Sequence, residues 1–208
     1  MLSPREMIDD RPDDNVFRVN RAAFTDAATF DREISEIFDR CWLYIGHASQ
    51  VPDHGDYIAT RLGFHPVFVI RGSDGEVQCF YDACSHRGSK LTRRTSGNAR
   101  TMTCRYHGWC FNADGDCTLV RGGDEAYRSE DLERMGTNLR PIEQFGEYKG
   151  FLFGCLDADA PSLEDFLGGA LPFIDLMADQ APDEMEVLRG ESRYIMEANW
   201  KLQTENST

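Results

Sequence analysis

The sequence has no apolar run long enough to cross a membrane and no excess of positive charge. Its best apolar run, Gly150–Leu156, is far shorter than the ~20 residues of a membrane-spanning helix. The 22 Lys and Arg are outnumbered by 36 Asp and Glu, which gives a formal charge of -14. Nucleic acid requires a clustered basic face, so we expect neither a membrane nor a nucleic-acid partner. We attribute the charge to solubility, with an acidic docking face for a redox partner as the alternative.

The chain also lacks the apolar core of a secretion signal, because residues 1–14 are of mixed charge. We therefore expect a cytoplasmic protein. In that compartment the seven cysteines are not expected to form structural disulfides, so they should be metal ligands or core residues. No internal repeat or low-complexity tract is present.

The 208 residues suffice for one domain and part of another, and the pattern divides them into three segments: 1–40, 41–157 and 158–208. In the first segment Thr25 or Asp26 can cap a helix. Apolar residues then recur at helical spacing, and we expect this stripe to face the core. The stripe comprises Phe30, Ile34, Ile37, Phe38, Cys41 and Trp42.

The second segment consists of short apolar runs separated by turns, which predicts strands. The turns Asp74-Gly75 and Asp114-Gly115 are typical of hairpins. The fold class is therefore mainly β, an antiparallel sandwich or barrel preceded by a helix. The expected strands are Tyr57–Arg61, Val67–Arg71, Val77–Tyr81, Cys117–Val120 and Gly150–Leu156.

The third segment reads as the start of an α+β domain. Ser162 is expected to cap a helix, Pro172 to interrupt it, and Phe173–Ala178 to form further helical turns. A strand is predicted over Glu186–Met196 and a helix over Asn199–Asn206. The chain then stops without a closing element, so we expect it to be the N-terminal fragment of a longer protein.

The chemically informative residues form two short motifs. Cys84-Ser85-His86 is a C-x-H motif, and after seventeen residues Cys104 and His107 form a C-x-x-H motif. Two such loops can close on a flat two-iron cluster from opposite sides, with two thiolates on one iron and two imidazoles on the other. This is the ligand set of a Rieske-type 2Fe–2S cluster.

Mixed ligation has a chemical purpose. Neutral imidazoles in place of two anionic thiolates make the cluster easier to reduce. Its reduction potential is then about −150 to +300 mV, against roughly −400 mV for all-cysteine plant-type ferredoxins. Five neighbouring residues suit such a cluster, because they let the backbone run close to it, shield it from water or place positive charge beside it. Each of them is explained equally well by ordinary packing or turn geometry. They are Arg87, Gly88, Tyr106, Gly108 and Trp109.

A zinc site is the alternative for the four ligands, but zinc fingers of this composition place a cysteine pair first and a histidine pair second. The remaining cysteines lie in apolar runs and are expected to be small buried residues: Cys41, Cys79, Cys110, Cys117 and Cys155. His47, His54 and His65 have no partner at ligand spacing and are expected to be structural or exposed.

With these motifs, the chain resembles the large subunits of Rieske non-haem iron aromatic-ring-hydroxylating dioxygenases. The segments Trp42–His47 and Tyr148–Phe153 resemble the entry to and exit from the Rieske domain, and Asn199–Asn206 resembles the helix that opens the catalytic domain. The segments Ala160–Gly168 and Glu186–Gly190 resemble the benzoate and anthranilate dioxygenase branch, which implies an aromatic carboxylate substrate.

The resemblance implies a reaction and its partners. An NADH-dependent reductase, with or without a ferredoxin, reduces the cluster, which passes electrons to a mononuclear iron held by residues that follow Asn206 in the family. Asn206 itself would lie near that iron, and His107 would connect through an aspartate to the iron of a neighbouring subunit. A trimer, with or without a small β subunit, follows from that link. The other class of function that fits the loops is a free-standing Rieske ferredoxin; a zinc-stabilised interaction module is a third.

Overall fold

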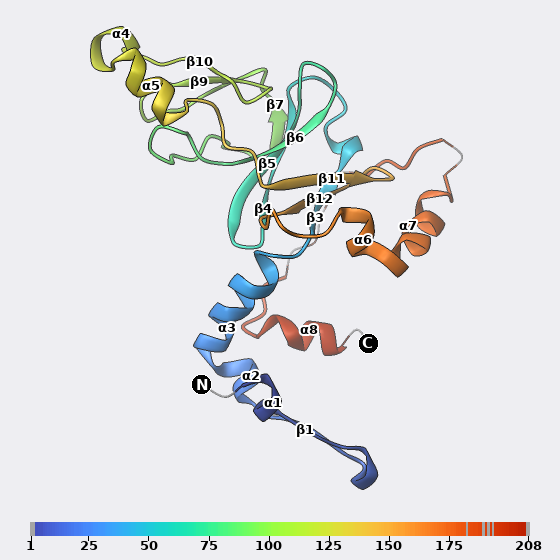
Figure 1. Cartoon of the computed structure of the whole chain (residues 1–208). Coiled ribbons are helices and arrows are strands. Elements are labelled where there is room, and N and C mark those ends of the chain that lie inside the picture. Colours follow the sequence, from blue (N-terminus) through green and yellow to red (C-terminus); the bar gives the residue numbers. More distant parts are fainter. Residues whose placement is uncertain (1–2, 182, 189, 191, 193, 207–208) are drawn as a thin grey trace. The chain divides into compact units, whose positions relative to one another are not determined.

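The structure is a computed structural model that describes residues 3–181, 183–188, 190, 192 and 194–206 (Figure 1). Its contacts define two compact units. One unit is Phe38–Leu188, and the other combines Met1–Ile37 with Arg189–Thr208. The sequence-based division at residues 40 and 157 stays a prediction. Among the described residues no helix is long and apolar enough to span a membrane.

The larger unit contains three antiparallel sheets, which confirms the mainly β fold; each sheet that the described residues form is open rather than closed into a barrel. The central sheet has the order β6-β5-β4-β7, the second β11-β12-β3 and the third β10-β9-β8. The strands are β3 Leu43–His47, β4 Asp56–Leu62, β5 His65–Arg71, β6 Val77–Tyr81, β7 Ser96–Asn98, β8 Thr101–Thr103, β9 Cys110–Asn112, β10 Cys117–Leu119, β11 Gln144–Tyr148 and β12 Phe151–Cys155.

The central sheet is buried on both faces, because successive side chains of a strand point to opposite sides. Val67 and Val69 of β5 pack with residues of the β11-β12-β3 sheet such as Leu152. Phe68 and Ile70 of the same strand pack into a different cluster, which includes Cys84, Cys104 and Trp109. The two predicted metal loops therefore rest on one face of the central sheet.

All five expected strands are confirmed to within two residues at each end. Asp74-Gly75 lies between β5 and β6, and Asp114-Gly115 lies between β9 and β10; both glycines have a positive φ, 90° and 86°. The strands β3, β7, β8, β9 and β11 were not predicted. Three of them have only three residues, too few for an alternating pattern to register.

Helices and turns surround the sheets: η3 Ala48–Gln50, α4 Gly123–Ala126, α5 Ser129–Met135, α6 Leu163–Leu167, η4 Gly168–Ala170 and α7 Leu171–Ala178. Ser162 caps α6 as predicted, since its side chain accepts a hydrogen bond from the Asp165 N–H. Trp42 anchors this region, because its indole donates to the Pro161 carbonyl (2.8 Å) and its ring packs with Leu163. Pro172 opens α7 instead of interrupting a helix, because a proline in the first turn lacks only an N–H that has no intrahelical partner.

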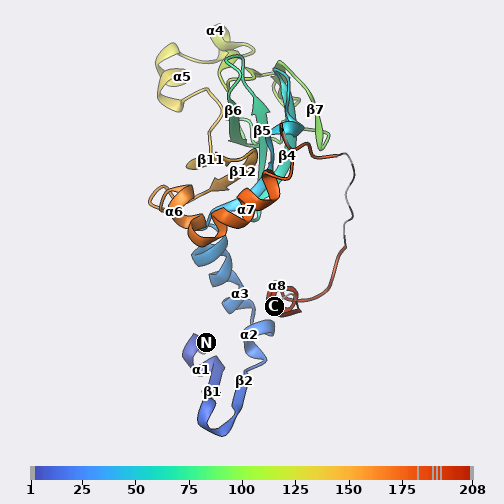
Figure 2. The same ribbon diagram turned by 90° about the vertical axis from the view of Figure 1, so that its right-hand side faces the viewer.

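The smaller unit contains α1 Pro4–Met7, β1 Ile8–Arg11, η1 Pro12–Asp14, β2 Val16–Val19, α2 Ala22–Thr25, α3 Ala27–Glu33 and α8 Trp200–Asn206. Figure 2 shows β1 and β2 as a hairpin, which the sequence did not predict. The helix α8 is held to α3 by Glu33, whose carboxylate accepts from the Trp200 indole (2.9 Å) and pairs with Lys201 (2.5 Å).

Three expectations need correction. Asp26 caps α3, but the helix gives way at Ile34 to a π-helical turn, Ile34–Phe38; of the expected stripe only Trp42 is fully buried, and Ile37 is 40% exposed. The strand over Glu186–Met196 is absent from the described residues of that range, while residues 189, 191 and 193 lie outside the described residues. Cys79 and Cys155 are buried as expected, but Cys41, Cys110 and Cys117 are only partly buried.

Candidate metal centre

The first predicted metal loop closes on itself with two backbone hydrogen bonds. The Cys84 N–H donates to the Ser89 carbonyl (2.9 Å), and the Gly88 N–H donates back to the Cys84 carbonyl (2.8 Å). Gly88 has φ 68°, a left-handed conformation that favours glycine. This closure turns the residues between Cys84 and Gly88 outward as a tight loop.

The second loop repeats the same construction. The Cys104 N–H donates to the Trp109 carbonyl (2.8 Å), and the Gly108 N–H donates to the Cys104 carbonyl (2.9 Å), with Gly108 at φ 74°. Each loop thus starts at a cysteine and ends at a left-handed glycine four residues later. The predicted histidine stands at the third position of the first loop, His86, and at the fourth position of the second, His107.

The thiol of Cys84 is buried and adjoins that of Cys104. Burial raises the pKa of Cys84 to about 11, although the backbone N–H groups of His86 and Arg87 donate to its sulfur and lower it in part. The Cys104 side chain hydrogen-bonds to Cys84 and raises that pKa further. A buried thiol surrounded by backbone donors is suited to a positively charged metal, because the metal replaces the proton.

The pKa of the Cys104 thiol is shifted in the opposite direction. Burial raises its pKa, but the N–H groups of Tyr106 and His107 and the side chains of Cys84 and Ser89 donate to the sulfur, so that the pKa is lowered overall. Both loops therefore direct backbone donors at their own cysteine. This is the arrangement that stabilises a thiolate.

The imidazole of His86 has two different surroundings. Nε2 lies 2.9 Å from the Tyr127 hydroxyl, whereas Nδ1 is buried and has no hydrogen-bond partner among the described residues. The ring stacks on Trp109 with a centroid distance of 4.8 Å and an angle of 4°. A buried ring nitrogen without a partner costs about 1–3 kcal/mol, which a metal bond to Nδ1 would remove. Burial, followed by the neighbouring His107 and Arg87, lowers the pKa of His86 and favours the neutral ring that binds metals.

The second imidazole, that of His107, lies beside the first. The two ring centroids are 4.6 Å apart. The exposed ring of Tyr106 covers His107, with the centroids of these two rings 3.9 Å apart. In the described part of the chain no hydrogen bond reaches the ring nitrogens of His107. The four predicted ligands thus form a pair of thiols and a pair of imidazoles.

Pairing of the donors bears on the kind of metal. No three His, Cys, Asp or Glu side chains of the described residues converge to hold a single ion, as a zinc site would require. A two-iron cluster needs only two protein ligands on each iron. The buried Nδ1 of His86 and the adjoining thiols of Cys84 and Cys104 fit a 2Fe–2S cluster, in which the thiols would bind one iron and the imidazoles the other.

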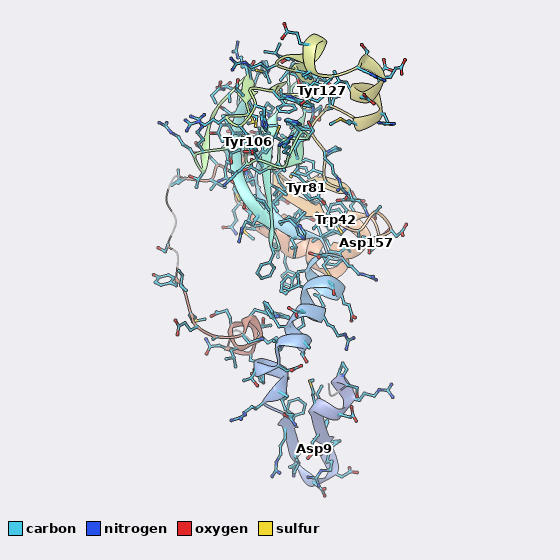
Figure 3. The ribbon with its side chains drawn as sticks, turned by 90° about the vertical axis from the view of Figure 1, so that its left-hand side faces the viewer. Asp9, Trp42, Tyr81, Tyr106, Tyr127 and Asp157 are labelled. Carbon is cyan, nitrogen blue, oxygen red and sulfur yellow. The ribbon has the colours of Figure 1, made fainter. Side chains whose placement is uncertain are left out.

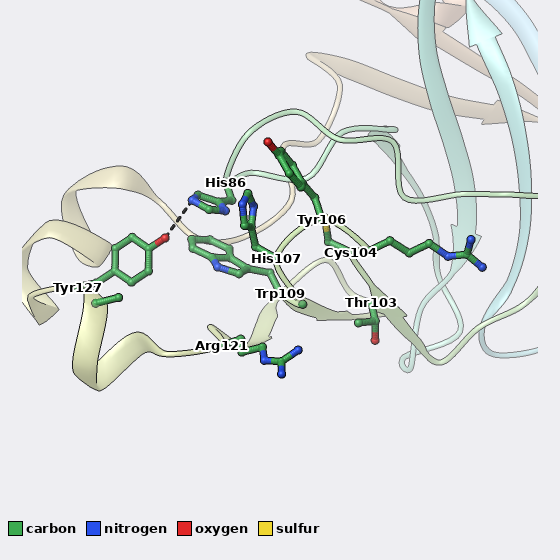
Figure 4. A pocket seen from close by; sticks show the side chains of 11 residues that line it. His86, Thr103, Cys104, Tyr106, His107, Trp109, Arg121 and Tyr127 are labelled. Carbon is green, nitrogen blue, oxygen red and sulfur yellow. Dashed lines mark hydrogen bonds between the residues drawn. The ribbon is translucent and has the colours of Figure 1, made fainter.

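An open hollow of about 520 Å³ borders these residues (Figure 4). Tyr127 hydrogen-bonds to His86 at one side of it, and Arg105 and Arg121 are the two arginines among its lining residues. Figure 3 places Tyr106 and Tyr127 at the same end of the larger unit, away from Trp42. The hollow is lined by His86, Thr103, Cys104, Arg105, Tyr106, His107, Gly108, Trp109, Arg121, Ala126 and Tyr127.

The other predicted site residues fall into three positions. Arg87 is exposed beside His86. Trp109 is 1% exposed, and its indole N–H has no partner in the part of the chain that the structure describes. Gly88 and Gly108 close the loops. Asn206 lies in α8 of the other unit.

Sequence reasoning missed three residues that contact the loops and one that lies beside the first loop. Tyr127 binds His86, Ser89 donates to Cys104, and Arg121 packs over Gly108. The fourth, Asp82, is 2% exposed and accepts hydrogen bonds from the N–H groups of Leu91 (2.9 Å) and Thr92 (3.0 Å). None belongs to a recognisable local motif; only the position of Asp82, two residues before Cys84, could have drawn attention to it.

The histidines outside the two loops have local roles. His47 is buried and its Nδ1 hydrogen-bonds with Ser49 (2.9 Å), while His65 pairs with Asp39 (3.2 Å). His54 is partly buried. The expectation that these three residues are structural or exposed is consistent with their positions.

Comparison with known proteins identifies a domain within the larger unit. Residues 41–129 match the family model of the Rieske 2Fe-2S domain. The chain is 41% identical over 201 residues to the toluate 1,2-dioxygenase subunit alpha of Pseudomonas putida, and 42% identical over 201 residues to the anthranilate 1,2-dioxygenase large subunit of Acinetobacter baylyi. Each match covers 96% of this chain, but only 44% and 42% of the respective relative.

Solved structures of the same kind of protein match the fold. The naphthalene 1,2-dioxygenase of a Rhodococcus species, solved with bound indole, matches with a TM-score of 0.83 and 33% identity over 90% of this chain and 42% of that protein. The protein described here therefore contains a Rieske domain. The comparisons confirm its resemblance to the large subunits of Rieske aromatic-ring dioxygenases, and the chain spans less than half the length of the relatives it matches.

Proposed function

We propose that Cys84, His86, Cys104 and His107 hold a Rieske 2Fe–2S cluster that supplies electrons to the dioxygenation of an aromatic carboxylate. The observation that carries the proposal is the repeated loop, in which a cysteine and a left-handed glycine four residues later frame a histidine. Two such loops bring paired thiols and paired imidazoles to one face of the central sheet.

The bound cluster would accept and release one electron at a time at a potential accessible to a nicotinamide-dependent reductase. The surrounding residues would stabilise the ligands and shield them from water. Backbone donors from His86, Arg87, Tyr106 and His107 stabilise the thiolates. Tyr127 orients His86, and the buried Trp109 keeps water from the inner side of that ring.

The oxygenase role is favoured over that of a free-standing ferredoxin by the extent of the match. The Rieske model covers residues 41–129, whereas the similarity to dioxygenase large subunits runs over 201 residues. The relatives are named for toluate, 2-halobenzoate and anthranilate, which are aromatic carboxylates. We therefore assign the substrate to that class.

The proposal extends to the partners of the whole protein. A mononuclear iron on residues that follow Asn206 would receive the electrons, and an NADH-dependent reductase, with or without a ferredoxin, would supply them. The relatives are named as alpha or large subunits, which supports an assembly that contains a small β subunit, and a trimer of large subunits would bring His107 to the iron of a neighbour. We place this assembly in the cytoplasm.

The test is an EPR spectrum of the purified protein after dithionite reduction, with iron and zinc quantified in the same sample. A rhombic signal with an average g value below that of an all-cysteine 2Fe–2S protein, together with two irons per chain, is expected. Zinc without iron and without a signal would refute the cluster and, with it, the oxygenase role.

A further inference from the structure

Residues 120–138 form an excursion that leaves β10 and contains α4 and α5. Its far end is bound back to the β9-β10 hairpin from which it starts. The side chain of Asn138 accepts from the Cys117 N–H (2.8 Å) and donates to the carboxylate of Asp116 (2.9 Å). The excursion therefore begins and ends at the same hairpin, and only the part between these ends is free to take another position.

Two consecutive residues of the first metal loop hold the excursion in place. The Ser85 hydroxyl donates to the Thr137 carbonyl (2.5 Å), and the Tyr127 hydroxyl is hydrogen-bonded to Nε2 of His86 (2.9 Å; Figure 4). Tyr127 and Leu132 also pack, partly buried, against the core cluster that contains both predicted cysteine ligands. The excursion is thus attached to the loop at the predicted imidazole ligand and at the residue before it.

The helices of the excursion are too short to be stable by themselves. The helix α4 has four residues and α5 has seven, and no side-chain hydrogen bond caps the N-terminus of either. Isolated helices of fewer than ~12–15 residues are marginal in water. Their structure therefore depends on the contacts with the metal loop and the core, and segments held by few such contacts are the ones that open locally.

A left-handed glycine stands on each side of the two helices. Gly122 has φ 73° and Gly136 has φ 66°, and among the described residues no atom would lie within 4 Å of a Cβ at either position. The backbone conformation, and not a lack of space, therefore requires these glycines. Hinges are positions at the ends of elements that absorb changes of φ and ψ, and both glycines occupy such positions.

The imidazole of His86 is held from two directions. One face of the ring stacks on Trp109, which belongs to the second metal loop, and the ring of Tyr127 meets it edge-on at a centroid distance of 6.0 Å and an angle of 83°. To turn away from a metal at Nδ1, the imidazole has to break its hydrogen bond to Tyr127. Release of this ligand therefore depends on movement of the excursion.

We propose that residues 120–138 are a clasp over the first metal loop, which opens for insertion of the cluster and closes to retain it. The proposal rests on the cluster proposed above. Opening breaks the hydrogen bonds to Ser85 and His86 and rotates the helices about Gly122 and Gly136, while Asn138 keeps the far end attached. No covalent bond of the chain changes. Ser85 and Tyr127 are positioning residues, because they act on the cluster only through the loop.

The first experiment measures the loss of iron from the loaded protein to a chelator, followed by the decay of the visible absorption of the cluster. Ser85→Ala should lose iron about two- to tenfold faster than wild type, as expected for the loss of one hydrogen bond. Ser85→Thr keeps a hydroxyl and should restore the slow rate. The control is Ser96→Ala, at an exposed serine in β7, and should leave the rate unchanged. Equal rates in Ser85→Ala and Ser96→Ala would overturn the proposal.

The second experiment follows the clasp itself, by limited trypsin cleavage of wild-type protein with its cluster and after removal of the cluster. Arg128 and Arg134 are exposed in the excursion, and Arg61 is exposed in β4 of the central sheet. Removal of the cluster should speed cleavage after Arg128 and Arg134 several-fold and leave cleavage after Arg61 unchanged. Equal cleavage of the two forms after Arg128 and Arg134 would contradict a clasp. An increase at all three sites would also contradict it, because the whole unit would then unfold.

The spectra of wild-type protein separate the clasp from the proposed function. Wild type purified without iron and without an EPR signal would refute the cluster itself. An intact wild-type cluster whose loss to the chelator is not accelerated by Ser85→Ala would refute only the clasp.

Discussion

The Tyr127 hydroxyl lies 2.9 Å from Nε2 of His86 and so joins the residue that follows α4 to the first metal loop, 41 positions earlier in the chain. The other ring nitrogen, Nδ1, is buried, and no described residue forms a hydrogen bond with it. If iron binds Nδ1, a neutral imidazole carries its proton on Nε2 and donates it to the Tyr127 oxygen. The hydrogen bond then makes the ring more electron-rich and favours the oxidised cluster.

We therefore expect Tyr127→Phe to retain the cluster and to raise its reduction potential. A net hydrogen bond is worth about 0.5–1.5 kcal/mol, and 59 mV corresponds to ~1.4 kcal/mol for one electron, so the shift should be on the order of tens of millivolts at most. A spectroelectrochemical titration measures it. Tyr44→Phe, at a tyrosine that is 54% exposed in β3, is the control. An unchanged or lower potential in Tyr127→Phe would show that the contact does not tune the cluster.

Asp82 fixes the base of the first metal loop. Its buried carboxylate accepts from the N–H groups of Leu91 and Thr92, and its second oxygen is hydrogen-bonded to the Thr92 hydroxyl. The Asp82 N–H also donates to the Pro66 carbonyl in β5 (2.9 Å). The residue thus connects both ends of the loop to the central sheet.

Replacement of Asp82 by alanine should lower the free energy of unfolding by ~3 kcal/mol or more and reduce the iron content, because several buried donors lose their acceptor. Asp82→Asn keeps one acceptor oxygen and should recover more than half of the loss. Urea unfolding and iron analysis measure both effects. If alanine and asparagine behave alike, the acceptor role assigned to the carboxylate is incorrect.

His107→Cys tests the second proposed imidazole ligand. An anionic thiolate in place of a neutral imidazole should lower the potential toward the roughly −400 mV of all-cysteine clusters and raise the average g value. His54→Cys, at a histidine outside both loops, is the matched control. A cluster whose potential does not fall in His107→Cys would exclude His107 as a ligand.

Cys110→Ala tests the choice of thiols, because Cys110 directly follows Trp109 in the second loop. Its sulfur lies 3.4 Å from the Thr103 hydroxyl and 3.6 Å from the Gly108 carbonyl. We expect the iron content and the EPR signal to be unchanged, since the four proposed ligands are other residues. Loss of iron would mean that Cys110 replaces Cys84 or Cys104.

Local features of this fold could be predicted well. The Asp-Gly turns, the Ser162 cap and the strands β4, β5 and β6 depend on residues within a few positions of one another. The burial of the apolar stripe that leads to Trp42 was predicted wrongly. Periodicity shows which residues share a helix face, but it does not show whether another element covers that face. The strand expected over Glu186–Met196 rested on loose alternation alone.

By itself, the sequence determined the proposed kind of metal centre, because the proposed ligands, their spacing and the glycine that closes each loop all lie within six residues of Cys84 or Cys104. Only the tertiary structure decided what surrounds that centre. Tyr127 and Arg121 contact the loops from segments further along the chain, and Asp82 is held beside the first loop by hydrogen bonds to Leu91 and Thr92; no local pattern encodes these contacts.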